Sequence, residues 1–138
     1  MVPTDGSDSS TAAVEQAVEI ADAEAATVHF LHLIDVRTEM SAGASGSIAP
    51  QLTETLEEEA DSALEEAANR AELADMSYER LTREGEPYEV IAAYCDDETV
   101  DLVVIGASGR SGVKERLLGS TTDRVVRTVD TSVLIARP

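Results

Sequence analysis

Short extended patterns alternate along the chain with segments in which apolar residues recur every three or four positions. TVHFLHLIDV and VDLVVIG are continuous apolar runs, which predict strands buried on both faces. MVPT is a shorter run that ends in the turn DGSDSS. In all, we predict five strands, at residues 1–4, 27–36, 76–85, 100–106 and 132–137.

Four segments between these strands have the features of helices. Apolar residues from Ala13 to Ala21 recur at helical spacing and predict a helix over residues 10–24. Residues 51–74 carry leucine and alanine on one face and glutamate on the other, which indicates a helix with a solvated acidic surface. Pro87 suits the first turn of a third helix, and a fourth is predicted over Ser120–Val129. Residues 38–51 predict a loop without a motif.

Strands that alternate with helices predict an α/β fold with a parallel sheet. Right-handed crossovers then place helices on both faces of that sheet, in three layers. The 138 residues are enough for one core, so we expect a single domain over 1–138.

Charge sets this chain apart from an average globular protein. Acidic residues outnumber basic ones by 28 to 10, the net charge is −18, and Lys114 is the only lysine. Such a surface stays hydrated in molar salt, where a Debye length of about 3 Å screens its self-repulsion. We therefore expect a protein from a halophile. The same balance argues against nucleic acids and anionic membranes as partners, because phosphate groups there are bound by basic surfaces.

The chain shows neither of the two common membrane-directing patterns. No apolar run approaches the roughly 20 residues that span a bilayer. The first residues also lack the basic and apolar regions of a secretory signal. We expect a cytoplasmic protein.

Candidate catalytic side chains are isolated in the sequence. Cys95, the single cysteine, falls on the apolar side of a predicted helix and is interpreted as a buried thiol. His29 and His32 share a strand at a spacing that puts them on opposite faces, so they are interpreted as packed residues and not as a ligand pair. No serine, cysteine or acid pair has a visible catalytic partner, so an enzyme is the less favoured interpretation.

One glycine-rich stretch, VIGASGRSGVKERLLGST at residues 104–121, follows the fourth predicted strand. In open α/β sheets, ligands bind beyond the carboxyl ends of the strands, which is where this stretch and the turn TDGS would lie. Gly106, Gly109 and Gly112 would let the backbone approach a ligand closely. Ser120 would cap the next helix, with Asp123 at capping-box spacing. The free N–H groups of such a helix start suit a phosphate.

The local charge agrees with a phosphate ligand. Five basic and two acidic residues lie between Gly106 and Arg127, a balance of +3 in a chain at −18. The alternative is that the glycines merely end a strand and the arginines keep a helix soluble. The stretch is not a Walker loop, because no Gly-Lys-Ser/Thr follows the glycines. Asp5 is placed to reach a ribose hydroxyl or a metal, or else to cap the first helix.

Three segments resemble the universal stress protein (UspA-like) family: VPTDGSDSS, LHLID and GASGRSGVKERLLGST. The last matches the signature of the family's ATP-binding branch, in which two residues separate Gly106 from Gly109 and nine separate Gly109 from Gly119 and Ser120. The three occur in the family's order and span the chain. The resemblance implies the adenine nucleotide alpha hydrolase-like fold, an open sheet of five parallel strands in the order 3-2-1-4-5.

The resemblance also implies a site for ATP, together with Mg²⁺ or Mn²⁺. Pro3, Thr4 and Asp5 would line the adenosine side, and Leu33 would offer backbone contacts to adenine. The loop after the fourth strand would wrap the ribose and phosphates, and the helix start would grip the phosphates. These two parts comprise Gly106, Ala107, Ser108, Gly109, Arg110, Ser111, Gly112, Gly119, Ser120, Thr121 and Thr122.

By the same resemblance the protein would be a homodimer that pairs through the last strand, at Val133, Leu134, Ile135 and Ala136. We expect a nucleotide-binding regulatory module of a stress response, which acts on a protein partner that the sequence does not name. Two alternatives remain open: a slow ATPase or self-phosphorylating enzyme with its acceptor near residues 120–122, and a structural dimer without nucleotide.

The chain departs from the family pattern at its start. Family members usually carry several apolar residues before VPTDGS, whereas Met1 stands almost at the turn here. The first strand is therefore expected to be about three residues long in the middle of the sheet, which leaves neighbouring backbone groups unpaired. A chain extended at this end is expected to melt at a higher temperature.

Overall fold

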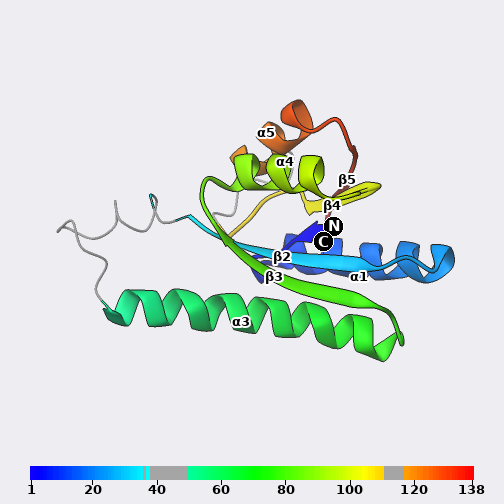
Figure 1. Cartoon of the computed structure of the whole chain (residues 1–138), viewed down its shortest axis with the longest axis horizontal. Coiled ribbons are helices and arrows are strands. Elements are labelled where there is room, and N and C mark those ends of the chain that lie inside the picture. Colours follow the sequence, from blue (N-terminus) through cyan, green and yellow to red (C-terminus); the bar gives the residue numbers. More distant parts are fainter. Residues whose placement is uncertain (36, 38–49, 111–116) are drawn as a thin grey trace.

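The computed structural model describes residues 1–35, 37, 50–110 and 117–138 (Figure 1). Strands and helices alternate along these residues, as the sequence predicts. The strands are β1 (Val2–Pro3), β2 (Val28–Ile34), β3 (Tyr78–Glu84), β4 (Leu102–Gly106) and β5 (Ser132–Ala136). The helices are α1 (Asp8–Glu24), α3 (Pro50–Leu73), α4 (Pro87–Asp97) and α5 (Ser120–Thr128). Residues 38–49 of the predicted loop lie outside the described residues. Its last two residues, Pro50 and Gln51, begin α3.

The strands form two parallel sheets, β1-β2-β3 and β4-β5. The predicted single five-stranded sheet with order 3-2-1-4-5 is therefore not confirmed, because no ladder joins β1 to β4 among the described strands. The reason is the length of β1, which has only two residues to pair. Met1 nevertheless links β1 to β4, because its carbonyl accepts from the Val104 N–H at 3.0 Å and its amine donates to the Leu102 carbonyl at 2.8 Å.

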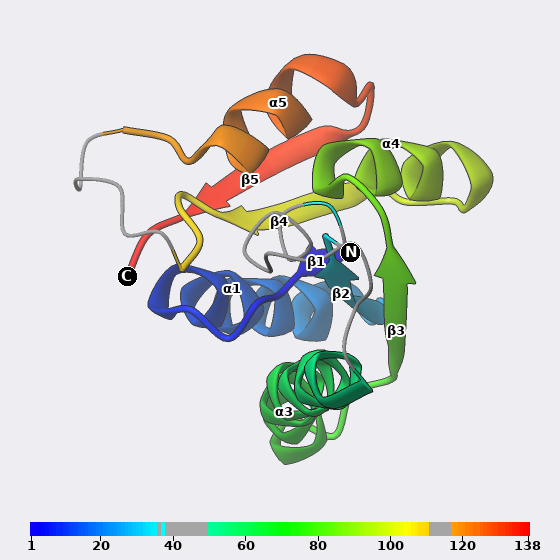
Figure 2. The same cartoon turned by 90° about the vertical axis from the view of Figure 1, so that its left-hand side faces the viewer.

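Helices pack on both sides of the strands (Figures 1 and 2). On one side, α1 and α3 enclose a core that includes Val2, Phe30 and Leu64. On the other, α4 and α5 supply Ile91 and Val125, which pack with Leu31 of β2 and two residues of β4. β2 and β4 thus have apolar side chains on both faces, which explains why these two strands are continuous apolar runs in the sequence.

The two histidines of β2 lie on opposite faces, as predicted. His29 shares a hydrogen bond of 2.6 Å with the Tyr94 hydroxyl on α4. His32 is buried, and its Nδ1 lies 2.9 Å from the Thr4 carbonyl oxygen. Cys95 is half-buried, and burial raises the pKa of its thiol. Within the parts of the chain that the structure describes, no helix is both long and apolar enough to cross a membrane.

Two leucines of α3 give a matched test of this packing. Leu64 is 3% exposed in the core, whereas Leu73 is 90% exposed at the end of the same helix. We expect Leu64→Ala to lower the free energy of unfolding by about 2–5 kcal/mol, because it leaves a cavity. Leu73→Ala should change it by less than about 0.5 kcal/mol. Denaturant unfolding of both variants in the same high-salt buffer checks this, and equal losses would contradict the placement of Leu64.

Candidate functional site

A pocket of about 290 Å³ opens at the carboxyl ends of β1 and β4. Most of the residues predicted for the site line it: Pro3, Thr4, Asp5, Leu33, Gly106, Ser108, Gly109, Arg110, Gly119, Ser120, Thr121 and Thr122. Ala107 does not line the pocket. It is buried, with its N–H bonded to the Ala136 carbonyl and its own carbonyl bonded to the Gly119 N–H, each at 2.8 Å. Ser111 and Gly112 lie outside the described residues.

Four further residues line the pocket and were missed in the sequence: Ser10, Leu31, Pro87 and Ile105. Signals for three of them were available. Leu31 lies two residues before Leu33 and therefore on the same face of β2. Ile105 directly precedes Gly106. Pro87 begins α4, and the helices of a parallel α/β fold start at the same edge at which its strands end.

Glycines allow the segments around the pocket to approach one another. A Cβ on Gly106 would lie 2.6 Å from the Ser9 carbonyl carbon, which is too close for any side chain. A Cβ on Gly109 would lie 2.8 Å from Asp5 Oδ2. These glycines therefore serve the packing of the loop against α1 and the first turn, in addition to any role toward a ligand.

The start of α5 differs from the predicted capping box. Gly119 is the N-cap residue, and none of the described side chains caps the helix there. Asp123 instead pairs with Arg127, at 3.0 Å between Oδ2 and Nε. Thr122 donates its hydroxyl to the Gly106 carbonyl at 2.7 Å, which ties the helix start to the end of β4. Ser120, Thr121 and Thr122, the first residues of α5, thus line the pocket at the positive end of the helix dipole, and their N–H groups have no side-chain cap from the described residues.

Asp5 is the acid that lines the pocket, and its carboxylate is held on both sides. Oδ1 accepts from the Ser7 N–H at 3.0 Å, and Oδ2 accepts from the Arg110 N–H at 3.2 Å. Burial by itself raises the pKa of Asp5, but the hydrogen bonds donated by Ser7, Ser10 and Arg110 outweigh it and hold the pKa below its usual range. Asp5 is therefore ionised at neutral pH.

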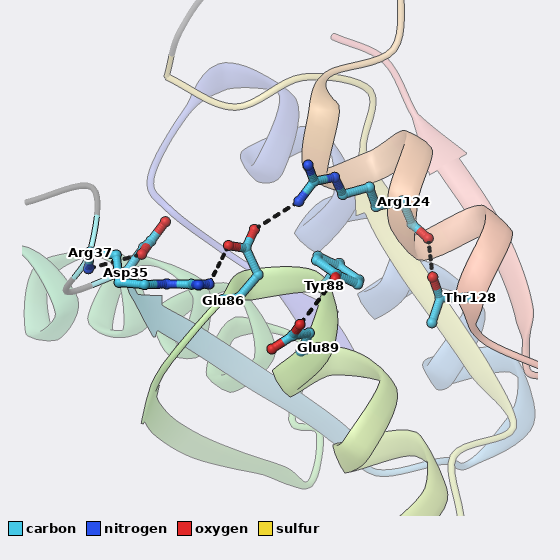
Figure 3. Close-up of polar contacts among 7 residues, drawn as sticks. All are labelled: Asp35, Arg37, Glu86, Tyr88, Glu89, Arg124 and Thr128. Atoms are coloured by element: carbon cyan, nitrogen blue, oxygen red, sulfur yellow. Dashed lines mark hydrogen bonds and ion pairs between the residues drawn. The ribbon is translucent and has the colours of Figure 1, made fainter.

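The basic residues near the pocket are paired with acids from distant elements. Arg110 contacts Glu59 of α3, with 2.6 Å between its Nη1 and Oε2. Glu86 binds Arg37 through one carboxylate oxygen and Arg124 through the other (Figure 3). The guanidinium of Arg124 also lies 5.0 Å from the centre of the Tyr88 ring.

These ion pairs offset part of the local charge of +3 in residues 106–127. That charge omits acids on other elements, and Glu59 and Glu86 pair with Arg110 and Arg124, so the positive charge of these arginines is not freely available to a ligand. Two of the five basic residues in that stretch, Lys114 and Arg116, lie outside the described residues. Among the described residues, no group of three or more His, Cys, Asp or Glu side chains is arranged to hold a metal ion.

Comparison with known proteins matches the model of the universal stress protein family to residues 1–137. The chain belongs to this family. A relative in Methanocaldococcus jannaschii, universal stress protein MJ0531, is 32% identical over 137 residues, which cover 99% of this chain and 80% of the relative.

Solved structures of other family members have the same fold. The structure of MJ0577, also from M. jannaschii, has a TM-score of 0.84 and 29% identity, and the match covers 99% of this chain and 93% of that one. A universal stress protein in complex with cAMP has a TM-score of 0.69 and 31% identity over the same shares of the two chains. This universal stress protein thus shares fold and length with relatives, one of which was solved with an adenine nucleotide.

His32 makes the stability of the pocket depend on pH, because its Nδ1 is hydrogen-bonded to the carbonyl oxygen of Thr4, which lines the pocket. Burial lowers the pKa of His32, and the nearby charge of Arg110 lowers it further, although the hydrogen bond to Thr4 opposes this. In the unfolded chain, histidine gains its proton near pH 6.5. The unfolded state therefore binds this proton before the folded state does, and stability is lost as pH falls below about 6.5 until the folded state is protonated too.

We expect His32→Gln to remove this contribution while keeping an N–H donor for Thr4. The difference in free energy of unfolding between the wild type and the variant should shrink as pH falls from 7.5 to 5. Denaturant unfolding at several pH values in constant salt measures it, and the subtraction cancels the titration of the many carboxylates. A difference that is constant with pH would contradict a depressed pKa at His32.

Proposed function

We propose that this chain is an ATP-binding universal stress protein, which holds the nucleotide in the pocket at the carboxyl ends of β1 and β4. The observation that carries the proposal is the mixed lining of this pocket. Leu31, Leu33, Pro87 and Ile105 line it with apolar side chains, and the glycine loop and the start of α5 line it with backbone and hydroxyl groups. A nucleotide likewise combines an apolar base with phosphates that accept hydrogen bonds.

The lining of the pocket supports this assignment. Pro3, Thr4 and Asp5 would lie on the adenosine side, where the ionised Asp5 carboxylate can accept from a ribose hydroxyl. The segment from Gly106 to Arg110 would border the ribose and phosphates, and Ser120 and Thr121 would offer N–H and hydroxyl groups to the phosphates. The Gly119 N–H and the Thr122 hydroxyl are already bonded to the Ala107 and Gly106 carbonyls. The family member solved with cAMP supports an adenine ligand at 31% identity.

A divalent cation, Mg²⁺ or Mn²⁺, is the expected companion of the bound nucleotide. Asp5 is the ionised carboxylate at the pocket, and the Ser120 and Thr121 hydroxyls lie at its phosphate end. Oxygen ligands of this kind suit hard cations, and Mg²⁺ is usually held by one or two carboxylates together with substrate phosphates. The cation would neutralise phosphate charge, which matters in a chain at −18.

The proposal includes a regulatory homodimer that acts in the cytoplasm and at high salt. The Ala136 carbonyl bonds to Ala107 beside β4, so the peptide groups of Val133 and Ile135 point to the opposite edge of β5. Among the described strands only β4 pairs with β5, and an edge of this kind is open to pairing with another chain. Nucleotide binding would then bias the conformation of the dimer or its choice of partner protein.

The binding test is Gly109→Val. The backbone at Gly109 accepts an L-residue, but the new side chain would occupy the space of the Asp5 carboxylate. We expect loss of ATP binding by at least about 100-fold, with circular dichroism unchanged. Equilibrium dialysis with ATP and Mg²⁺ in molar KCl measures affinity, and Ala23→Val on the exposed surface of α1 is the control.

Ligand released from the purified wild type identifies what the pocket holds. Mass spectrometry that finds intact ATP supports binding without rapid turnover. ADP with released phosphate would indicate a slow ATPase instead. If no nucleotide is released and none binds in high salt, the proposed function is wrong.

The dimer test uses proline on the open edge of β5. Val133→Pro removes an N–H that points away from β4, so the monomer fold should tolerate it while strand pairing with a second chain is blocked. We expect a native circular dichroism spectrum and half the wild-type molar mass by light scattering after size exclusion. Leu134→Pro is the control, because its N–H faces β4 and its loss should destabilise the fold. A dimeric Val133→Pro variant would exclude this edge as the interface.

A further inference from the structure

Arg110 is held by contacts from two elements that are far apart in the sequence. Its N–H donates to Asp5 Oδ2 at 3.2 Å, and its Nε donates to the Asp5 carbonyl at 2.8 Å. Its Nη1 donates to Glu59 Oε2 of α3 at 2.6 Å. One arginine thus ties the glycine loop to the turn after β1 and to α3.

This arginine is also the only basic side chain among the described residues that line the pocket. A guanidinium N–H that is donated to Glu59 is not at the same time available to a phosphate oxygen. Counted together, Asp5, Arg110 and Glu59 carry a net charge of −1, which repels an anion. A phosphate group that enters the pocket therefore competes with Glu59 for the Nη1 contact and for the positive charge of Arg110, but not for every N–H of the guanidinium.

The pair is arranged so that such an exchange is feasible. The side chains of Arg110 and Glu59 are 50% and 45% exposed, so the pair is screened by water and is weak. Because the guanidinium is planar and rigid, its Nη1 cannot move while its Nε stays on the Asp5 carbonyl. The exchange therefore requires the exposed Glu59 side chain to turn away and leave Nη1 to the phosphate, while the two contacts of Arg110 to Asp5 remain.

We propose that Glu59 is a specificity-determining residue of the pocket, which occupies Arg110 until a nucleotide phosphate replaces its carboxylate. This inference rests on the proposed function. Glu59 then weakens the binding of phosphorylated ligands and leaves an uncharged nucleoside unaffected. The exchange also frees one carboxylate on the exposed face of α3, so that the loaded protein presents a different charge there from the empty one.

The test compares ATP with adenosine on wild type and Glu59→Gln. We expect the variant to bind ATP with Mg²⁺ about twofold to fivefold more tightly, the range for an exposed ion pair, and adenosine with unchanged affinity. Isothermal titration in the same salt measures both. Glu57→Gln is the matched control, because it removes an equal charge from the same helix about 200° around its axis. It should alter neither affinity.

A double-mutant cycle with Arg110→Gln separates competition from a general effect on the fold. In that background, Glu59→Gln should no longer raise ATP affinity. If wild type binds ATP but Glu59→Gln binds it equally or more weakly, the inference is wrong and the proposed function stands. A gain of the same size for adenosine would also overturn the inference. If wild type binds neither ligand, the proposed function fails and the inference with it.

Discussion

The approach of Gly106 to the first turn of α1 is the contact on which the site depends. A Cβ at this position would lie 2.6 Å from the Ser9 carbonyl carbon, so the end of β4 can approach the start of α1 this closely only because Gly106 has no side chain. From the other side, the Thr122 hydroxyl bonds to the Gly106 carbonyl. The end of one strand is thereby fixed between two helix starts. The turn after β1 and the glycine loop converge on the same pocket because of this contact.

Electrostatics at the pocket follows from pairing across elements. Glu59 and Glu86 reach in from α3 and the start of α4, and they engage Arg110 and Arg124. The cations of the basic stretch thus stabilise the arrangement of the loop and helices before any ligand is considered. A phosphate bound as proposed would depend first on neutral donors, namely N–H groups of the loop and of α5, and would reach the Nη1 of Arg110 by replacing Glu59.

Local patterns in the sequence predicted the α/β class, because the apolar runs and helical spacings reflect burial on one or two faces. The resemblance to the universal stress protein family, carried by three motifs, implied most of the residues that line the pocket. The short first strand and the pairing lost beside it were also predicted, from the start of the motif VPTDGS. Two properties were not local and could not be predicted. Ser120 does not reveal that Gly119 takes the cap, and the basic stretch does not reveal Glu59. Each is decided by a partner on another element.

A chain with a net charge of −18 can accept an anionic ligand, because the distance over which its charges act shortens as the salt concentration rises. Across a Debye length of about 10 Å in dilute buffer, many of the surface carboxylates repel a nucleotide together. In molar salt this length falls to about 3 Å, and the summed repulsion disappears. The contacts of Arg110, at 2.6–3.2 Å, are close to that length. High salt therefore removes the repulsion of the whole surface while leaving direct hydrogen bonds, so the acid that would matter most to the proposed ligand is Glu59, which is in contact with Arg110.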